Sequence, residues 1–403
     1  MEELSQLQRS YGLMTANLFS GALLVLSALY FTVPIIQVLS DEFDISTSTA
    51  SWSGTAFSFF FAIGCLIYGP LSSRVGRKRV MVAGLIGLAL ATVLTYITHS
   101  FAWLLLLRCL QGATASTFSP VALTYAGEMF PPSKRVTVIG FISTGFLMSG
   151  IFGQVVASVL TYWSGWNSLF LVFGCLYAIL AVCFILFLPE AEKTISSAQK
   201  KSKGSIMNNR SLLLCYVVTI TVLLCFVGTY SALEFQLSAP PFSLEFSEIV
   251  TIRAVGIVGM ILCPFSGRLC SRFGMPAILR SGLAIAVTSL LLLGFVKHML
   301  IYAIISVMFV AGIALIVPSL IALIGEHGGS GRALATSIYT FILFIGASLG
   351  PIVAMAVIEQ QRAISVYHLF AALFFISFIC SIFVKQPAIA LSSLSSSQSN
   401  VSP

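Results

Sequence analysis

Apolar, charge-free stretches follow one another along most of this chain. They cover residues 10–40, 45–73, 80–107, 109–127, 136–189, 211–233, 281–296, 298–325, 333–358 and 363–384. Only 8% of the residues are charged, whereas an ordinary globular domain carries about a quarter, so a water-exposed surface cannot be built from this chain. A helix of about 20 apolar residues crosses the ~30 Å hydrocarbon core of a bilayer. The sequence therefore predicts an all-α integral membrane protein.

The apolar stretches divide into twelve predicted transmembrane helices. Residues 136–189 are too long for one helix, and interfacial aromatic residues around Gly165 split them into two. The run between residues 249 and 271 has Arg253 and Arg268 near its ends, where long side chains can reach the membrane surface. The predicted spans are 14–38, 51–71, 79–98, 101–127, 137–160, 167–188, 211–232, 249–271, 275–296, 299–324, 333–357 and 364–384.

The positions of the cations predict the orientation of the chain. Of the 21 Lys and Arg residues, 17 fall on the side that holds both termini, two lie within spans, and only Lys297 and Arg362 fall on the opposite side. An excess of Lys and Arg marks the cytoplasmic face, so both termini are predicted to be cytoplasmic. This distribution explains the net charge of +8 without a nucleic-acid partner. The long first apolar run is predicted to be a retained helix rather than a cleaved signal peptide.

A polar cytoplasmic segment divides the spans six and six. The predicted parts are an N-terminal six-helix bundle at 1–188, a linker at 189–210, a C-terminal six-helix bundle at 211–385 and a disordered, serine-rich tail at 386–403. A Gly-Pro pair occurs at Gly350-Pro351 in the eleventh predicted helix, whereas Gly153 in the fifth is followed by Gln154.

Sequence matches between the two predicted bundles indicate an internal repeat. A shift of 198 residues places Gly267–Gly274 over Gly69–Gly76 and Glu326 over Glu128, and a shift of 197 places Arg332 over Arg135. Matches in the same order at nearly one offset indicate a duplicated six-helix unit. Two pseudo-symmetric six-helix bundles with a solute cavity between them form a common transporter architecture.

Residue patterns typical of catalysis do not occur in the sequence. The nine cysteines are scattered along apolar spans, and the four histidines lie far apart, so no metal site is predicted. The spans contain no paired acids, no Gly-x-Ser-x-Gly elbow and no nucleotide-binding loop. We therefore predict that the protein is not an enzyme, needs no cofactor and uses an ion gradient rather than ATP.

Two motifs carry a resemblance to a known family. The loop after the second predicted helix fits the pattern G-x-L-[AS]-D-R-x-G-[RK]-[RK] through Gly69, Leu71, Ser72, Arg74, Gly76, Arg77 and Lys78. The fourth predicted helix fits L-x-x-x-R-x-x-Q-G through Leu104, Arg108, Gln111 and Gly112. Over residues 10–385 the chain resembles the major facilitator superfamily, and within it the twelve-helix drug:proton antiporter branch. The resemblance implies the major facilitator fold and a monomer in the plasma (inner) membrane.

In the family the loop after the second helix latches the outward-facing state. The resemblance implies the same role for Gly69, Ser73, Arg74, Gly76, Arg77, Lys78 and Glu128. Glycines permit close helix approach and tight reversals, and Glu128 is a candidate ion-pair partner for one of the cations. Ser73 stands where the family has an acid; it can hydrogen-bond a helix N-terminus but forms no ion pair, which predicts a weaker latch. The alternative is that these cations serve only topology and lipid contact.

Arg108 lies about 10 Å into the fourth predicted helix, where a cation is costly unless it faces protein or water. The family's arginine at this position is implicated in proton coupling, so the resemblance makes Arg108 a candidate, with a brace for helix packing as the alternative. Spans one to six contain no carboxylate in their interior. Glu234 and Arg253 are further proton-coupling candidates, because a Glu can exchange its proton for a salt bridge; both residues could equally face water at the interface.

Aromatic and amide side chains supply candidates for a solute cavity, since such groups suit amphipathic solutes. The candidates are Tyr30, Pro34, Gln111, Gln154, Tyr230 and Tyr339. Ordinary helix packing is the alternative for each of them. Phe57, Phe59, Phe60 and Phe61 surround the second predicted helix, and lipid contact is predicted for most of them.

The predicted function is secondary active export of small amphipathic compounds or a metabolite by alternating access, in exchange for protons. The alternative is proton-coupled symport or facilitated uptake of a small nutrient. Two departures from the antiporter branch keep that alternative open: the missing acid in the first six spans, and the Gly-Pro pair that occurs at Gly350 rather than after Gly153.

Overall fold

The computed structural model describes residues 2–190, 209–238, 243, 248, 255–296, 299–359 and 366–386, with the backbone alone at 2–10, 47, 48, 234, 238, 330 and 359. All regular elements of this described part are helices. They form two compact units. Among the described residues, unit 1 contains 2–130 and 141–190, and unit 2 contains 131–140 and the residues from 209 onward.

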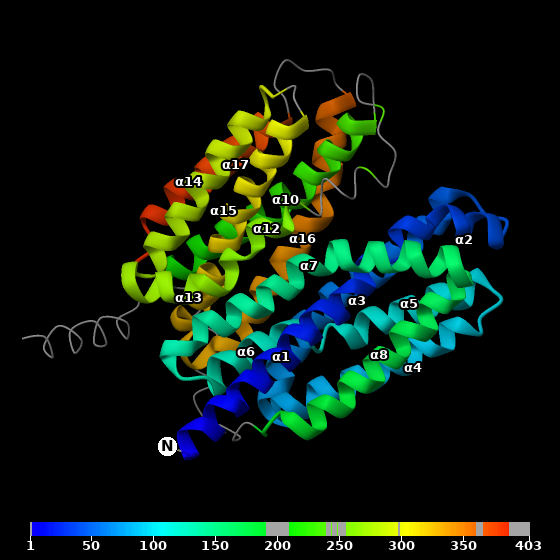
Figure 1. The fold of residues 1–403 in the computed structure, drawn as a ribbon, viewed down its shortest axis with the longest axis horizontal. Coiled ribbons are helices and arrows are strands. Elements are labelled where there is room, and N and C mark those ends of the chain that lie inside the picture. Colours follow the sequence, from blue (N-terminus) through cyan, green and yellow to red (C-terminus); the bar gives the residue numbers. More distant parts are fainter. Residues whose placement is uncertain are drawn as a thin grey trace, which may run out of the picture. The chain divides into compact units, whose positions relative to one another are not determined.

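Unit 1 is built from helices that pack side by side (Figure 1). Helix α3 packs against α5, and α4 packs against both α5 and α8. The elements are α1 (Glu2–Tyr30), η1 (Val33–Ile35), α2 (Ile36–Glu42), α3 (Thr47–Val75), α4 (Arg77–Tyr96), α5 (Phe101–Ala115), α6 (Ser119–Met129), α7 (Pro132–Ser164) from residue 141, and α8 (Trp166–Phe187).

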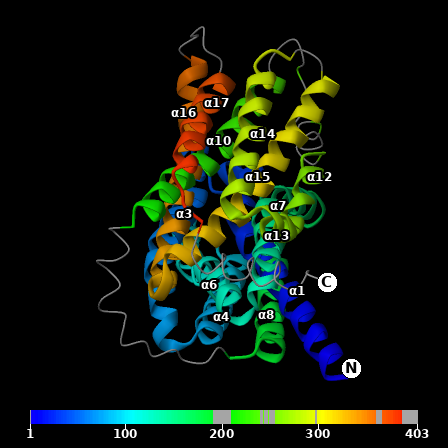
Figure 2. The same ribbon diagram turned by 90° about the vertical axis from the view of Figure 1, so that its left-hand side faces the viewer.

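Unit 2 combines the first residues of α7 with the helices of the second half of the chain (Figure 2). Helix α10 packs against α16 and α17, and α14 packs against α15 and α17. The elements are α10 (Arg210–Ser238), α12 (Ile257–Met260), α13 (Leu262–Phe273), α14 (Met275–Leu293), α15 (Met299–His327), η2 (Gly329–Gly331), α16 (Arg332–Glu359) and α17 (Val366–Ile382).

Nine membrane-span candidates occur within the described residues, judged by length and composition. They are Tyr11–Glu42, Thr49–Val75, Arg77–Tyr96, Pro132–Ser164, Trp166–Phe187, Arg210–Leu237, Met275–Leu293, Met299–His327 and Arg332–Ile358. The other three predicted spans coincide with the pair α5 and α6, the pair α12 and α13, and α17, each element of which is shorter than 18 residues. Twelve spans therefore stay a prediction.

Proline explains why two predicted spans are broken. A proline has no N–H to donate to the carbonyl four residues earlier, and its ring disfavours a continuous helix. Pro120 follows the turn at 116–118 between α5 and α6, so the prediction of one helix over 101–127 is wrong at this point. Pro34 follows the end of α1 at Tyr30, and the predicted helix 14–38 is likewise interrupted before η1 and α2.

Equivalent glycines start the helices that follow the two repeated loops. Gly76 precedes α4 with a φ of 116°, and Gly274 precedes α14 with a φ of 86°. Both φ values lie in a region that side chains with a Cβ rarely adopt. Because these two positions are related by the 198-residue shift, the same backbone turn recurs in both halves of the chain.

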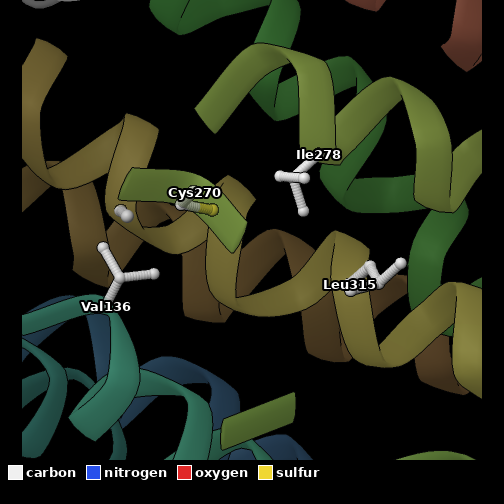
Figure 3. Packing of buried hydrophobic residues seen from close by; sticks show 5 residues of the cluster. Val136, Cys270, Ile278 and Leu315 are labelled. Atoms are coloured by element: carbon white, nitrogen blue, oxygen red, sulfur yellow. The ribbon is translucent and has the colours of Figure 1, made fainter. Parts of the chain in front are cut away.

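The first residues of α7, up to Gly140, pack within unit 2. Val136 belongs to a buried apolar cluster that also contains Cys270, Ile278, Leu315 and Ala322 (Figure 3). Glycines bring the backbones together there. A Cβ on Gly140 would overlap the carbonyl oxygen of Cys263, and a Cβ on Gly267 would overlap Thr137.

Candidate functional site

Arg108 lies at the centre of unit 1, and none of its surface is exposed to solvent. Its Nε donates to the carbonyl oxygen of Ser53 at 2.9 Å, Nη1 donates to Oε1 of Gln111 at 2.7 Å, and Nη2 donates to the carbonyl oxygen of Ala28 at 2.8 Å. All three acceptors are neutral. Within the described part of the chain, no carboxylate lies within ion-pair distance of Arg108.

Aromatic rings complete the surroundings of the Arg108 guanidinium. Its central carbon lies 4.5 Å from the ring centroid of Phe57 and 5.1 Å from that of Phe31. The negative faces of aromatic rings attract a cation, and the attraction is stronger away from water. Phe57 and Phe61 are buried, whereas Phe59 and Phe60 are exposed, so only two of the four phenylalanines of α3 are accessible to lipid.

Gln111 extends the network to a fourth helix. While its Oε1 accepts from Arg108, its Nε2 donates to Oγ1 of Thr95 at 2.8 Å and to the carbonyl oxygen of Ala91 at 3.3 Å. Residues three apart share one face of a helix, which is why Arg108 and Gln111 can act together. The two side chains link α1, α3, α4 and α5.

Gly112 sets the distance between α3 and α5. A Cβ built at this position would overlap the carbonyl oxygen of Phe57, one helical turn beyond the Ser53 carbonyl that receives Arg108. The absence of a side chain lets the two backbones approach closely. Gln111 and Gly112 of the motif therefore support the position of Arg108. Gln111 does so by a hydrogen bond, and Gly112 does so by letting α3 approach α5.

Gly112→Ala should lower the melting temperature of the detergent-purified protein. Because the added methyl group meets backbone atoms that cannot rotate away, the expected cost is about 1–3 kcal/mol. Gly12→Ala in α1 is the matched control, since nothing lies within 4 Å of a Cβ built there. That exchange should be neutral or stabilising by up to about 1 kcal/mol. Equal melting temperatures for the two variants would contradict the close-contact role of Gly112.

Arg77 forms the best-connected ion pair of unit 1. Its Nη2 and Nε donate to Oε1 and Oε2 of Glu128 at 2.8 Å and 3.1 Å. Its Nη1 donates to the carbonyl oxygen of Gly69 at 3.1 Å and to Oγ of Ser72 at 2.6 Å. Arg77 is 7% exposed. The sequence left open which loop cation pairs with Glu128. In the structure it is Arg77, which also binds the end of α3 through Gly69 and Ser72.

The remaining loop residues have other contacts. Ser73 donates to the carbonyl oxygen of Pro70 in its own helix at 2.6 Å. Arg74 is exposed. Lys78 donates to the carbonyl oxygen of Ile185 at 2.7 Å, and this contact fastens the start of α4 to the end of α8.

A second charge cluster occurs in unit 2 around Glu326, the repeat partner of Glu128. Oε1 of Glu326 accepts from Nη2 of Arg332 and from Nη1 of Arg135, both at 2.7 Å. Met275 stands at the position related to Arg77 by the 198-residue shift, so the second half lacks that cation. In unit 2 the acid is instead held by arginines from the first turns of α7 and α16.

The six cavity candidates fall into two groups. Tyr30, Pro34 and Gln154 are half-buried in unit 1, and the ring of Tyr30 lies 3.8 Å from a Cβ built on Gly150, one turn before Gln154 in α7. The other three are buried inside their own units and are Gln111, Tyr230 and Tyr339.

The two buried tyrosines of unit 2 differ in the partners of their hydroxyl groups. The Tyr230 hydroxyl lies 3.3 Å from Oγ of Ser306, whereas the Tyr339 hydroxyl has no hydrogen-bond partner among the residues that the structure describes. Two proton-coupling candidates lie outside the described part of the chain: the side chain of Glu234 and the whole of Arg253.

A polar cluster in unit 2 was not predicted from the sequence. The hydroxyls of Tyr302 and Tyr367 both donate to Oε1 of Gln236, at 3.0 Å and 2.9 Å, which joins α15 and α17 to α10. No spacing rule connects three residues so far apart in sequence. Among the residues that the structure describes, no group of three His, Cys, Asp or Glu side chains has the arrangement of a metal site.

Comparison with known proteins gives a family and a fold. The sequence matches the model of the Major Facilitator Superfamily over residues 18–351. The structure resembles the crystal structure of the human organic anion transporter MFSD10 (TETRAN), with a TM-score of 0.70, 18% identity, and coverage of 92% of this chain and 99% of that one. At this identity the likeness concerns the fold alone.

Several bacterial proteins are similar in sequence. An uncharacterized transporter of Buchnera aphidicola subsp. Schizaphis graminum is 26% identical over 346 residues, covering 85% of this chain and 84% of the relative. The inner membrane transport protein YnfM of Escherichia coli strain K12 is 27% identical over 64% of each chain. The multidrug resistance protein MdtG of Proteus mirabilis is 26% identical over 69% of this chain and 72% of the relative.

Proposed function

The chain belongs to the Major Facilitator Superfamily of multi-pass membrane transporters, and from this premise we propose that it exports small amphipathic compounds or a metabolite in exchange for protons. The similarity to MdtG, a multidrug resistance protein, carries the proposal of export. We place the protein in the plasma membrane as a monomer with both termini cytoplasmic, because Lys and Arg concentrate on that side.

Alternating access requires contacts that hold one state and break in the other. We assign this role to the loop residues around Arg77 and Glu128. The four hydrogen bonds that the largely buried Arg77 guanidinium donates give the loop a defined shape, which a latch needs. Half-buried Tyr30, Pro34 and Gln154 are the residues of unit 1 that we assign to the solute cavity, because aromatic and amide groups suit amphipathic solutes.

The carrier of the coupled proton is proposed to be Glu234. A guanidinium remains protonated at all physiological pH values, so Arg108 cannot release a proton itself. The interior of the first six predicted spans contains no acid that could do so. The same observation favours the second candidate function, which is symport or facilitated uptake of a small nutrient without an antiported proton.

Flux measurements separate the two functions. Purified protein in liposomes loaded with a pH-sensitive dye would be screened against dyes, antibiotics, sugars and organic acids. Proton movement opposite to solute movement is the expected result, and Glu234→Gln should reduce it at least about tenfold, since the amide cannot take up a proton. Proton movement in the same direction as the solute, or solute flux without any proton signal, would instead establish the second candidate.

A further inference from the structure

The first predicted membrane span has a break next to Arg108, which is fully buried in unit 1. Helix α1 ends at Tyr30, a turn follows, and η1 and α2 continue the span. The last carbonyl oxygens of a helix have no N–H partners within it, and inside a membrane there is little water to act as a donor instead. Pro34 adds to the shortage of donors, because it has no N–H that could donate to the carbonyl oxygen of Tyr30.

The hydrogen bonds of the break show where one of these carbonyls finds a partner. The N–H of Phe31 still donates to the carbonyl oxygen of Ser27 at 3.0 Å, which is the last helical bond before the turn. The next carbonyl oxygen, that of Ala28, accepts Nη2 of Arg108 at 2.8 Å. Arg108 thus occupies the place of a capping group at the C-terminal end of α1.

Electrostatics explain why a buried cation is stable at this point. The C-terminal end of a helix carries a partial negative charge, and cations placed there are stabilised, more strongly when they are buried. The ring faces of Phe31 and Phe57 add attraction from two sides. These contacts compensate a charge that has no carboxylate partner within the described residues.

We propose that Arg108 is a positioning residue that caps the broken end of α1 and thereby fixes the bend in the first membrane span. The role rests on the proposed transport function, because the bend places Tyr30 and Pro34, two of the proposed cavity residues. Ser53, Gln111 and Thr95 hold the guanidinium in the orientation that reaches Ala28. Arg108 acts through a constant charge and hydrogen bonds, not through a change in protonation.

A double-mutant cycle tests the cap without any transport assay. Hydrogen–deuterium exchange of the amides at residues 29–36 would be followed by mass spectrometry in nanodiscs. Arg108→Met should speed this exchange about tenfold, because the end of α1 loses its cap, whereas Arg108→Lys should keep part of the protection. Pro34→Ala restores an N–H for Tyr30, so the same Arg108→Met exchange should have a smaller effect in that background.

Control variants keep the test decisive. Cys109→Ala changes the neighbouring residue on α5 and should leave exchange at 29–36 unchanged. Where Arg108→Met does not yield folded protein, Gln111→Leu removes the acceptor of Nη1 and should speed the exchange to a smaller extent, about threefold. Unchanged exchange in the folded Arg108 or Gln111 variants, or an equal effect of Arg108→Met with and without Pro34, would overturn the proposal.

Transport kinetics separate positioning from proton coupling. Arg108→Lys should raise the KM for the solute while the pH dependence of flux stays that of the parent. A shifted pH profile with unchanged amide exchange would make Arg108 a coupling residue and overturn the proposal. The exchange experiment needs neither solute nor proton gradient, so a failure of the proposed export function would leave its result interpretable.

Discussion

Replacing Glu326 by Gln should strongly destabilise unit 2. One carboxylate oxygen accepts from both Arg135 and Arg332 at 2.7 Å, and Glu326 is only 12% exposed. Without the negative charge, two guanidinium groups that are 21% and 17% exposed face each other with no acid between them. Removing one partner of a buried ion pair typically costs about 3–5 kcal/mol.

Thermal unfolding of the purified variants measures this effect. Glu190→Gln is the matched control, because Glu190 pairs with Arg79 at the same kind of distance, 3.1 Å, but both side chains are more than half exposed. An exposed pair is worth about 0–1 kcal/mol, so the control should melt close to the parent. Arg135→Gln added to Glu326→Gln removes one unpaired cation and should recover part of the loss. Equal melting of the Glu326 and Glu190 variants would contradict the prediction.

The fold class and the family could be predicted from the sequence because both depend on patterns along the chain. Long apolar stretches define helices in a membrane whatever their neighbours, and the motifs around Gly76 and Arg108 identify the family. The two helix breaks were missed for a physical reason. A count of apolar residues does not register that Pro34 and Pro120 lack an N–H, although both prolines are visible in the sequence.

The partners of the charged residues could be predicted only in part. Glu128 was expected to pair with a loop cation because it lies at the end of the fourth predicted helix, on the same side as the loop. The repeat identified Arg135 and Arg332 as equivalent residues, but equivalence does not reveal that both bind Glu326. Arg108 bonds to the backbone carbonyl oxygens of Ala28 and Ser53. Every residue has such an oxygen, so the sequence could not identify these two as partners of Arg108.

Arg77→Lys, a change that keeps the charge, should weaken the loop between α3 and α4 and slow transport. The arginine uses three nitrogens at once: two on the carboxylate of Glu128 and a third on Gly69 and Ser72. A lysine has a single nitrogen and cannot form the two parallel bonds to a carboxylate while it reaches the other acceptors. The acceptors that remain buried without a donor should cost about 2–3 kcal/mol.

Arg74→Lys supplies the control for this prediction, since Arg74 lies in the same loop with the same charge but is exposed. Melting temperature and initial transport rate would be measured for both variants, with insertion into the membrane checked for each. Arg77→Lys should lower both quantities, and Arg74→Lys neither. If both variants behave like the parent, the cations of this loop act by charge alone, as a signal for membrane orientation and a contact for lipid phosphates. The specific geometry around Arg77 would then have no part in the transport cycle.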